Sequence, residues 1–153
     1  MGLRISGKYT LIYLFVLLCV HQLTEARGQL RVRRNAFQMC NLINRFTGES
    51  CLQFNPYGCF CGYGQQGSEP VDEADRCCKR HDDCYGEVHN EGHCYFWSGV
   101  FVGYNDECDE FGCRCTDVAK CARKVCECDL ALARCLGKAT YNQQFQHYDR
   151  SQC

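Results

Sequence analysis

The sequence contains no apolar run long enough to span a lipid bilayer. The longest, LIYLFVLLCV from Leu11 to Val20, has ten residues, about half of the roughly 20 that a membrane-spanning helix needs. Arg4 and Lys8 precede this run, and Ala26 follows it as the last small residue of a cleavage signal. The arrangement predicts a secretory signal peptide over residues 1–26 and therefore a secreted, extracellular protein.

A second processing signal follows the predicted signal peptide. Arg31, Arg33 and Arg34 form the R-x-R-R pattern that processing proteases cut. We therefore expect residues 27–34 to be a short propeptide. The mature chain would then have 119 residues, from Asn35 to Cys153, which is enough for one domain and too few for two.

An excess of basic charge is also missing. Residues 35–153 contain 11 Lys and Arg against 17 Asp and Glu, a net charge of −6. A basic patch is the usual signature of nucleic-acid binding, and positive charge is what draws proteins to anionic lipid. We therefore expect no nucleic-acid partner and no strong attraction to anionic membranes. Repeats, low-complexity tracts and linkers are likewise absent from this segment.

Cysteine, by contrast, is abundant. Sixteen of the seventeen cysteines lie in residues 35–153, and Cys19 falls in the predicted signal peptide. An even number of cysteines in an oxidising compartment predicts up to eight disulfides in a small scaffold that depends on cross-links. Zinc binding is the alternative, but sixteen thiolates would not stay reduced outside the cell.

Hydrophobic periodicity and terminal signals predict three helices. They are expected over Ala36 to about Arg45, over Val71 to Val88 and over Thr116 to Leu136. Gly48 would stop the first helix, Thr116 would cap the last one, and Gly137 stands just past its end.

Two further segments read as loop and hairpin. NPYGCFCGYGQQG, from Asn55 to Gly67, holds four glycines and one proline and is predicted to be a loop. YNDECDEFGCRC, from Tyr104 to Cys115, predicts a short hairpin that turns at residues 109–112.

Cysteine spacing relates the second and third helices. Seven residues are only about 20° short of two helical turns, so Cys77 and Cys84 share a face, as do Cys128 and Cys135. If the helices are antiparallel, the bridges Cys77 to Cys135 and Cys84 to Cys128 have the same register. A parallel pair would accept the swapped bridges equally well, so spacing leaves the direction open.

A titratable pair lies on this bridged face. His81 stands between Cys77 and Cys84, and in the antiparallel register Asp129 comes within its reach. An imidazole oriented by a carboxylate on rigid elements is the arrangement of a general base. A helical histidine beside an aspartate is more often a surface pair, so the bridge register and the glycine loop are what favour catalysis.

The next residue suggests a metal site. Asp82 points about 100° further round the helix, toward the glycine-rich loop. Glycines allow backbone carbonyls to turn inward, and carbonyl oxygens with one carboxylate suit Ca²⁺ better than zinc or copper.

Three motifs together resemble secreted phospholipase A2 in its pancreatic and elapid-venom form: YGCFCGYG, DRCCKRHDDCY and CECDLALARCL. The resemblance covers essentially residues 35–153. It implies a mainly α, disulfide-rich fold with an N-terminal helix, a calcium loop, two long antiparallel disulfide-linked helices and a small two-stranded β-wing. It also implies a calcium-dependent hydrolase of the sn-2 ester of glycerophospholipids at a membrane or micelle surface. We expect a monomer, with a protein receptor as a further candidate partner. The alternative is a receptor-binding, toxin or matrix protein on the same scaffold.

The resemblance assigns roles residue by residue. His81 would be the base, Asp129 would hold its tautomer, and Tyr85 and Tyr104 would hydrogen-bond the aspartate, although both tyrosines could simply be packing. The calcium ligands would be the backbone carbonyls of Phe60, Gly62 and Gly64 and the carboxylate of Asp82. Gln65 replaces a customary glycine, and one extra residue follows Gly64.

The resemblance also implies disulfides: Cys59–Cys153, Cys61–Cys78, Cys77–Cys135, Cys84–Cys128, Cys94–Cys121 and Cys115–Cys126. Cys40, Cys51, Cys108 and Cys113 remain. We expect a bridge from Cys108 back to the N-terminal segment, with Cys40 and Cys51 as competing partners.

Aromatic residues suggest a lipid-facing surface. The stretch YFWSGVFVGY, residues 95–104, could line the acyl channel together with Phe37, Phe60 and Tyr63, or could pack against the helices. Trp97 is the expected membrane contact, because indole rings favour the headgroup level.

Overall fold

The computed structural model describes residues 35–64, 66–95 and 101–153. The predicted signal peptide, propeptide and cleavage sites lie outside these ranges, as do Gln65 and Trp97. Within the described ranges, no helix combines the length and the apolarity needed to cross a bilayer.

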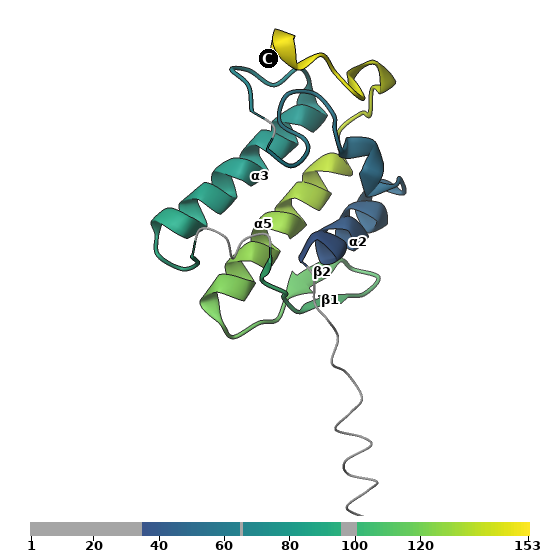
Figure 1. Cartoon of the computed structure of the whole chain (residues 1–153). Coiled ribbons are helices and arrows are strands. Elements are labelled where there is room, and N and C mark those ends of the chain that lie inside the picture. The colour runs from purple at the N-terminus through teal and green to yellow at the C-terminus, as the bar shows by residue number, and fades with distance from the viewer. Residues whose placement is uncertain (1–34, 65, 96–100) are drawn as a thin grey trace, which may run out of the picture. The chain divides into compact units, whose positions relative to one another are not determined.

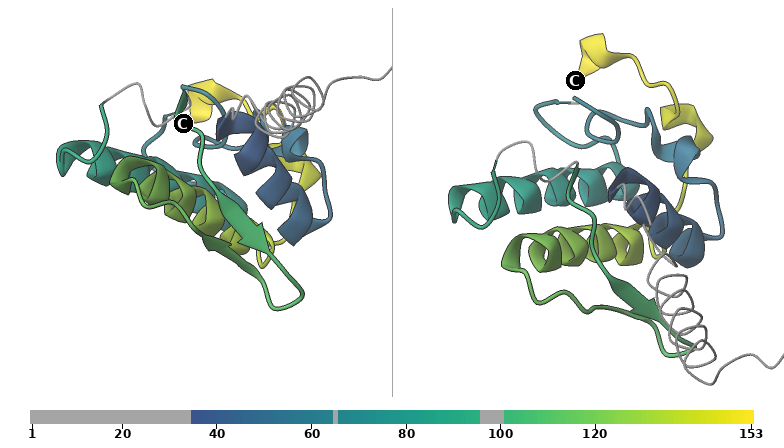
Figure 2. Two further views of the ribbon diagram at one scale, coloured as in Figure 1. Left: turned by 90° about the horizontal axis from the view of Figure 1, so that it is seen from below. Right: turned by 60° about the horizontal axis from the view of Figure 1, so that its bottom comes forward.

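Three helices form the body of the domain: α2 (Asn35–Thr47), α3 (Glu73–Asn90) and α5 (Lys120–Leu136). Helices α3 and α5 lie side by side, and α2 packs against α5 (Figures 1 and 2). A small hairpin of β1 (Asp106–Cys108) and β2 (Cys113–Cys115) precedes α5. Short 3-10 turns complete the order, η1 at Cys51–Phe54, η2 at Gln143–Phe145 and η3 at Arg150–Gln152. The predicted mainly helical, disulfide-rich class is confirmed.

The start of α3 follows the capping signals in the sequence. Asp72 is the N-cap, and its side chain accepts a hydrogen bond from the backbone N–H of Asp75. Glu73 and Asp75 lie in the first turn, where carboxylates interact favourably with the helix dipole. Helix α2 runs two residues further than expected, to Thr47, and ends as predicted at Gly48, which has a φ of 72°.

The predicted start of α5 is wrong. The helix begins at Lys120 rather than Thr116, and its N-cap position, Ala119, makes no side-chain cap hydrogen bond. Thr116 instead donates its backbone N–H to the carbonyl of Asn105, and the Asp117 carboxylate accepts from the Asn105 side chain at 2.7 Å. These contacts with the segment before β1 hold residues 116 and 117 outside the helix.

The end of α5 is at the predicted place for a different reason. Gly137 has an ordinary helical φ of −65°, so it is no left-handed cap. A Cβ at this position would lie 2.6 Å from the carbonyl oxygen of Phe46. Glycine is therefore required because α2 passes very close to the end of α5 here.

All sixteen cysteines of the described residues are paired, in eight disulfides. The six bridges implied by the family resemblance are present. Cys77–Cys135 and Cys84–Cys128 also settle the question of direction, because together they make α3 and α5 antiparallel. The zinc alternative is excluded for these sulfurs.

The expected bridge from Cys108 to the N-terminal segment is wrong. Cys108 pairs with Cys113, and Cys40 pairs with Cys51. In the hairpin register Cys108 lies directly opposite Cys113, with their Cα atoms 4.0 Å apart. The turn brings Cys113 alongside Cys108. Cys40 therefore pairs with Cys51, which follows the end of α2.

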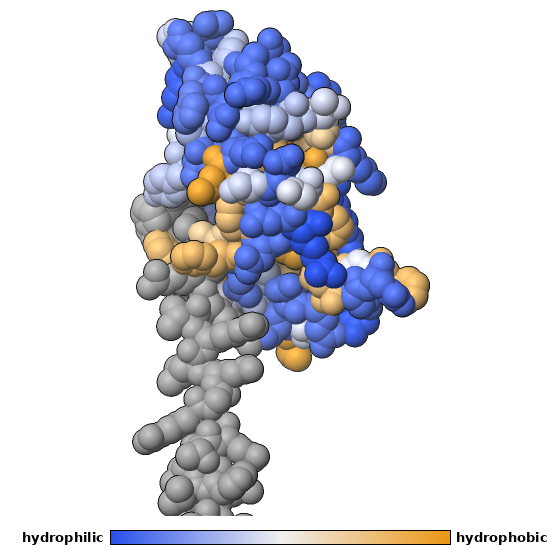
Figure 3. Space-filling model, turned by 90° about the vertical axis from the view of Figure 1, so that its right-hand side faces the viewer, coloured by the Kyte–Doolittle hydropathy of each residue, from blue (hydrophilic) through white to orange (hydrophobic). Residues whose placement is uncertain are grey.

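The core lies between the three helices and the glycine-rich loop. Its fully buried side chains include Leu42 of α2, Val125 of α5 and Tyr57 of the loop. On the face in Figure 3, hydrophobic residues gather in patches among hydrophilic ones. Among the residues that the structure describes, the buried polar ones are Asn35, Asp75 and Asp129.

Candidate active site

His81 and Asp129 meet between α3 and α5. Nε2 of His81 lies 2.8 Å from Oδ1 of Asp129. The carboxylate is fully buried, and the imidazole keeps 14 % of its exposure. The disulfides Cys77–Cys135 and Cys84–Cys128 lie on either side of the pair in the sequence. They fix the spacing of the two helices at the height of the contact.

The hydrogen bond also assigns the two ring nitrogens. An ionised carboxylate can only accept, so Nε2 of His81 carries the proton and donates it to Asp129. Nδ1 is then the unprotonated nitrogen, and it lies on the side of Asp82, 4.0 Å from Oδ1 of that residue. Nδ1 is therefore free to accept a proton.

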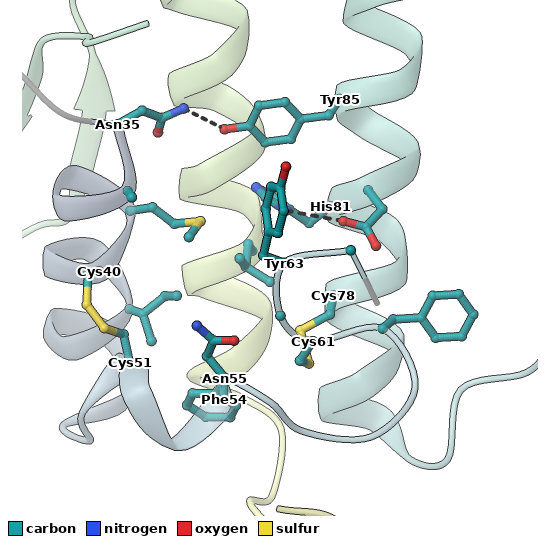
Figure 4. Close-up of a pocket in the computed structure, with 18 of the residues that line it drawn as sticks. Asn35, Cys40, Cys51, Phe54, Asn55, Cys61, Tyr63, Cys78, His81 and Tyr85 are labelled. Atoms are coloured by element: carbon teal, nitrogen blue, oxygen red, sulfur yellow. Dashed lines mark hydrogen bonds and ion pairs between the residues drawn. A yellow bond between two sulfur atoms is a disulfide. The ribbon is translucent and has the colours of Figure 1, made fainter. Parts of the chain in front are cut away.

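Tyrosine and asparagine side chains extend this pair toward the start of α2. The hydroxyl of Tyr85 donates to Oδ1 of Asp129 at 2.8 Å. The side-chain amide of Asn35 in turn donates to the Tyr85 hydroxyl at 2.9 Å (Figure 4). Burial, and then the charge of Asp129, raise the pKa of Tyr85. The phenol therefore stays protonated as a donor.

Tyr104 occupies the other side of the carboxylate. Its hydroxyl and Oδ2 of Asp129 are both buried, and neither has a hydrogen-bond partner among the described residues. Burial, and then the charge of Asp129, raise the pKa of Tyr104, so this phenol also stays protonated. Gln38 of α2 holds this tyrosine in place, since its side chain bonds both the backbone N–H and the carbonyl of Tyr104.

A cavity of about 680 Å³ opens onto His81 (Figure 4). Its walls are mainly apolar and come from α2, η1, α3 and α5. Deep in the fold they include Ile43, Leu132 and Leu136. At the rim stand four largely exposed apolar side chains, Phe37, Leu52, Tyr63 and Tyr95. Such a cavity suits one long apolar chain with its polar end at the imidazole.

A second cavity, of about 430 Å³, adjoins the glycine-rich loop. Phe60, Gly62, Gly64 and Asp82 line both cavities. Gly62 and Gly64 have φ values of 127° and 70°, which residues other than glycine rarely adopt. The predicted calcium ligands therefore share one wall beside His81.

The chemistry of this wall fits a hard divalent cation. Desolvation raises the pKa of the Asp82 carboxyl to about 6, and the negative charges of Asp83 and Asp75 add to the shift while His81 opposes it. The nearby ammonium of Lys79 is bonded to Asp83 at 2.9 Å rather than to Asp82. A carboxylate among like charges, beside the backbone carbonyls of a glycine-rich loop, offers the oxygen ligands that Ca²⁺ prefers.

The structure also places other residues that the sequence analysis singled out. The carbonyl of Gly64 accepts a hydrogen bond from Arg150 at 3.3 Å, so as a ligand it would use its second lone pair. Phe101 is 74 % exposed, whereas Val102 packs against the core. The cluster of Glu73, Cys77 and Cys135 has the spacing of a metal site, but its two sulfurs form a disulfide.

Sequence reasoning missed Asp75, whose carboxylate is completely buried beneath the glycine-rich loop. A signal was present in the helical spacing. Asp75 lies three residues before Cys78 and so shares its face of α3, and Cys78 was already expected to tether the loop through Cys61.

A family model described as phospholipase A2 matches residues 36–146 of the chain. The matched range contains the glycine-rich loop, both disulfide-linked helices and the hairpin between them.

Proposed function

The chain belongs to the phospholipase A2 family, and from this we propose that it is a secreted, calcium-dependent phospholipase A2. It would hydrolyse the sn-2 ester of glycerophospholipids to lysophospholipid and free fatty acid. The observation that carries the proposal is the His81–Asp129 pair at 2.8 Å, placed at the end of an apolar cavity and beside Asp82.

His81 would act as a general base on water. With Nε2 committed to Asp129, Nδ1 takes a proton from a water molecule as the water oxygen attacks the ester carbonyl carbon. The tetrahedral intermediate then collapses, and the imidazolium returns that proton to the departing alkoxide of the lysophospholipid. The acyl carbon keeps the water oxygen, so the reaction yields the fatty acid without an acyl-enzyme.

Asp129 would stabilise the imidazolium formed in the first step. Its negative charge is buried and already bonded to Nε2, so no side chain has to move when the ring becomes charged. The hydroxyl of Tyr85 keeps Oδ1 oriented toward the ring.

The glycine-rich loop and Asp82 would hold Ca²⁺ through the carbonyls of Phe60, Gly62 and Gly64 and one carboxylate. Bound there, the ion supplies positive charge for the substrate phosphate and for the oxyanion. Besides the ion, the backbone N–H of Gly62 would donate a hydrogen bond to the oxyanion. Losing such a donor typically costs about 10²-fold or more in rate.

The rim of the apolar cavity would bind the lipid surface. Phe37, Leu52, Tyr63 and Tyr95 are all at least 64 % exposed around its mouth. The net charge of −6 on residues 35–153 opposes binding to anionic lipid, so a peripheral monomer on zwitterionic membranes is the expected working form. The eight disulfides agree with an extracellular setting.

The test is release of fatty acid from the sn-2 position of mixed-micelle substrate, with Ca²⁺ and with EDTA. Wild-type protein beginning at Asn35 should be active only with Ca²⁺, and His81→Gln should be inactive. His93→Gln is the matched control, since His93 pairs with Glu91 and does not line the cavity. Activity that survives in His81→Gln would refute the mechanism. A folded, calcium-binding protein without any hydrolysis would favour the alternative of a binding protein on this scaffold.

A further inference from the structure

Asp75 is a buried charge that the proposed mechanism does not use. It belongs to the first turn of α3, its exposure is 0 %, and burying a carboxylate is costly unless hydrogen bonds compensate it. Its two oxygens accept from three backbone N–H groups, those of Cys59 at 2.9 Å, Phe60 at 2.7 Å and Val71 at 3.0 Å. Two of these donors belong to the glycine-rich loop.

The loop is shaped to receive this carboxylate. Gly58 has a φ of 56°, and a Cβ there would lie 2.4 Å from Cγ of Asp75. No side chain could therefore replace the hydrogen atom of Gly58 without displacing Asp75. The successive N–H groups of Cys59 and Phe60 form a concave set of donors around the anion.

These contacts fix the peptide groups that lead into the predicted calcium ligands. Asp75 holds the peptide planes on both sides of Cys59, while the next N–H, that of Cys61, donates to the carbonyl of Tyr57 at 3.2 Å. In a planar trans peptide the carbonyl points opposite to the N–H. The Phe60 carbonyl therefore points away from Tyr57, in an orientation set before any ion is present.

The position of the loop, by contrast, is set by covalent bonds. Cys59 is bonded to Cys153 and Cys61 to Cys78. Both bonds would remain if the carboxylate were lost. The loop would then stay attached to the domain, and the hydrogen bonds between Tyr57 and Cys61 would remain, but the two peptide planes beside Cys59 would lose the acceptor that orients them.

We propose that Asp75 is a positioning residue for the calcium site. Its carboxylate pre-organises the first part of the glycine-rich loop, so that the Phe60 carbonyl needs little rearrangement to bind the ion. This inference rests on the proposed function, because it concerns the same metal site. It adds a residue that touches neither the substrate nor the ion and acts through the backbone of Cys59 and Phe60.

Asp75→Asn tests the inference, with Asp83→Asn as its control. Both variants remove one negative charge near Asp82, and Asp83 raises the pKa of Asp82 more than Asp75 does. Asp83, however, is exposed and bonded to Lys79 rather than to the loop backbone. The control thus reports the loss of a nearby charge without the loss of a contact to the loop backbone.

Calcium affinity is measured by isothermal titration calorimetry on protein beginning at Asn35. In Asp75→Asn the Kd for Ca²⁺ should rise about 10- to 100-fold, the usual effect of losing a residue that supports metal ligands. In Asp83→Asn it should rise at most about fivefold, as for exposed charges. At saturating Ca²⁺, kcat of Asp75→Asn should return close to that of the wild type, a split that general destabilisation would not produce.

Hydrogen exchange in the wild type keeps the inference testable if Asp75→Asn does not fold. The amides of Cys59, Phe60 and Val71 should be protected in calcium-free protein, because Asp75 holds them without the ion. Protection that appears only on adding Ca²⁺ would overturn the inference, as would an Asp75→Asn affinity equal to that of Asp83→Asn. Wild-type protein that binds no Ca²⁺ would instead contradict the calcium dependence of the proposed function.

Discussion

Replacing Asp129 by asparagine is the sharpest test of how His81 is oriented. Oδ1 of Asp129 already accepts from both His81 and the Tyr85 hydroxyl, whereas Oδ2 has only the buried Tyr104 hydroxyl beside it. An asparagine can therefore keep its oxygen in the Oδ1 position and donate its nitrogen to Tyr104. The correct tautomer of His81 should survive the substitution.

The rate should then fall only because the negative charge of Asp129 is lost, and not because His81 adopts the wrong tautomer. A hydrogen bond to a charged group contributes about 1.5–3 kcal/mol and a neutral one about 0.5–1.5 kcal/mol. Losing the charge of Asp129 should therefore raise the barrier by about 1.4 kcal/mol, which is about tenfold in kcat. A histidine in the wrong tautomer would cost far more, about 10⁴-fold in a Ser-His-Asp triad.

The assay is kcat for sn-2 hydrolysis on mixed micelles at saturating Ca²⁺. Asp129→Asn should retain about a tenth of the wild-type rate. Adding Tyr104→Phe removes the acceptor for the amide nitrogen, so the double variant should fall well below the product of the two single effects. A loss beyond about 10³-fold in Asp129→Asn alone would refute this reasoning about the tautomer, and an unchanged rate would show that the pair is not used.

Three further predictions concern pH, cross-links and lipid charge. Because the pKa of Asp82 is raised to about 6, the Ca²⁺ affinity measured by calorimetry should weaken as the pH falls below 6. An affinity that does not change between pH 7.5 and pH 5 would contradict this. The same raised pKa means that protonation favours the fold, so calcium-free protein should lose this contribution as the pH rises through 6, and Asp82→Asn should abolish that slope. Replacing Cys59 and Cys153 by alanine should reduce the free energy of unfolding by about 2–3 kcal/mol more than replacing Cys108 and Cys113, since the loops closed span 94 and 5 residues; equal losses in urea denaturation would count against the entropic argument. Vesicle partition should favour zwitterionic over anionic lipid because of the net charge of −6, and a strong preference for phosphatidylglycerol would reverse that view.

The disulfide ladder shows what spacing in the sequence can and cannot predict. Cys77 and Cys84 are seven residues apart on one helix, so periodicity alone places both on a face that can bridge to a second helix. Helix direction had to come from the structure, or from the family resemblance, because both directions satisfy the spacing. The contact between His81 and Asp129 follows from the same ladder and was within reach of the sequence.

Errors arose where a distant segment decides the local structure. Thr116 has the residue type of an N-cap, but its backbone N–H and its hydroxyl both donate to the carbonyl of Asn105. The assignment of Cys108 to a distant partner was a different kind of error, because the predicted turn at residues 109–112 already places Cys108 opposite Cys113, as the strand register shows. Asp75 was overlooked because its burial depends on how the glycine-rich loop folds back over α3.

The Cys40–Cys51 bridge leaves α2 in an unusual position. Both cysteines lie within residues 35–54, and none of the other seven disulfides involves this stretch. Apart from the peptide chain, this stretch is therefore held to the remainder by non-covalent contacts alone: Leu42 packs in the core, Gln38 bonds the backbone of Tyr104, and Asn35 bonds Tyr85. One wall of the acyl cavity thus depends on packing and hydrogen bonds, whereas the wall that bears His81 is cross-linked by disulfides. Admission of a bulky lipid tail should therefore begin on the α2 side.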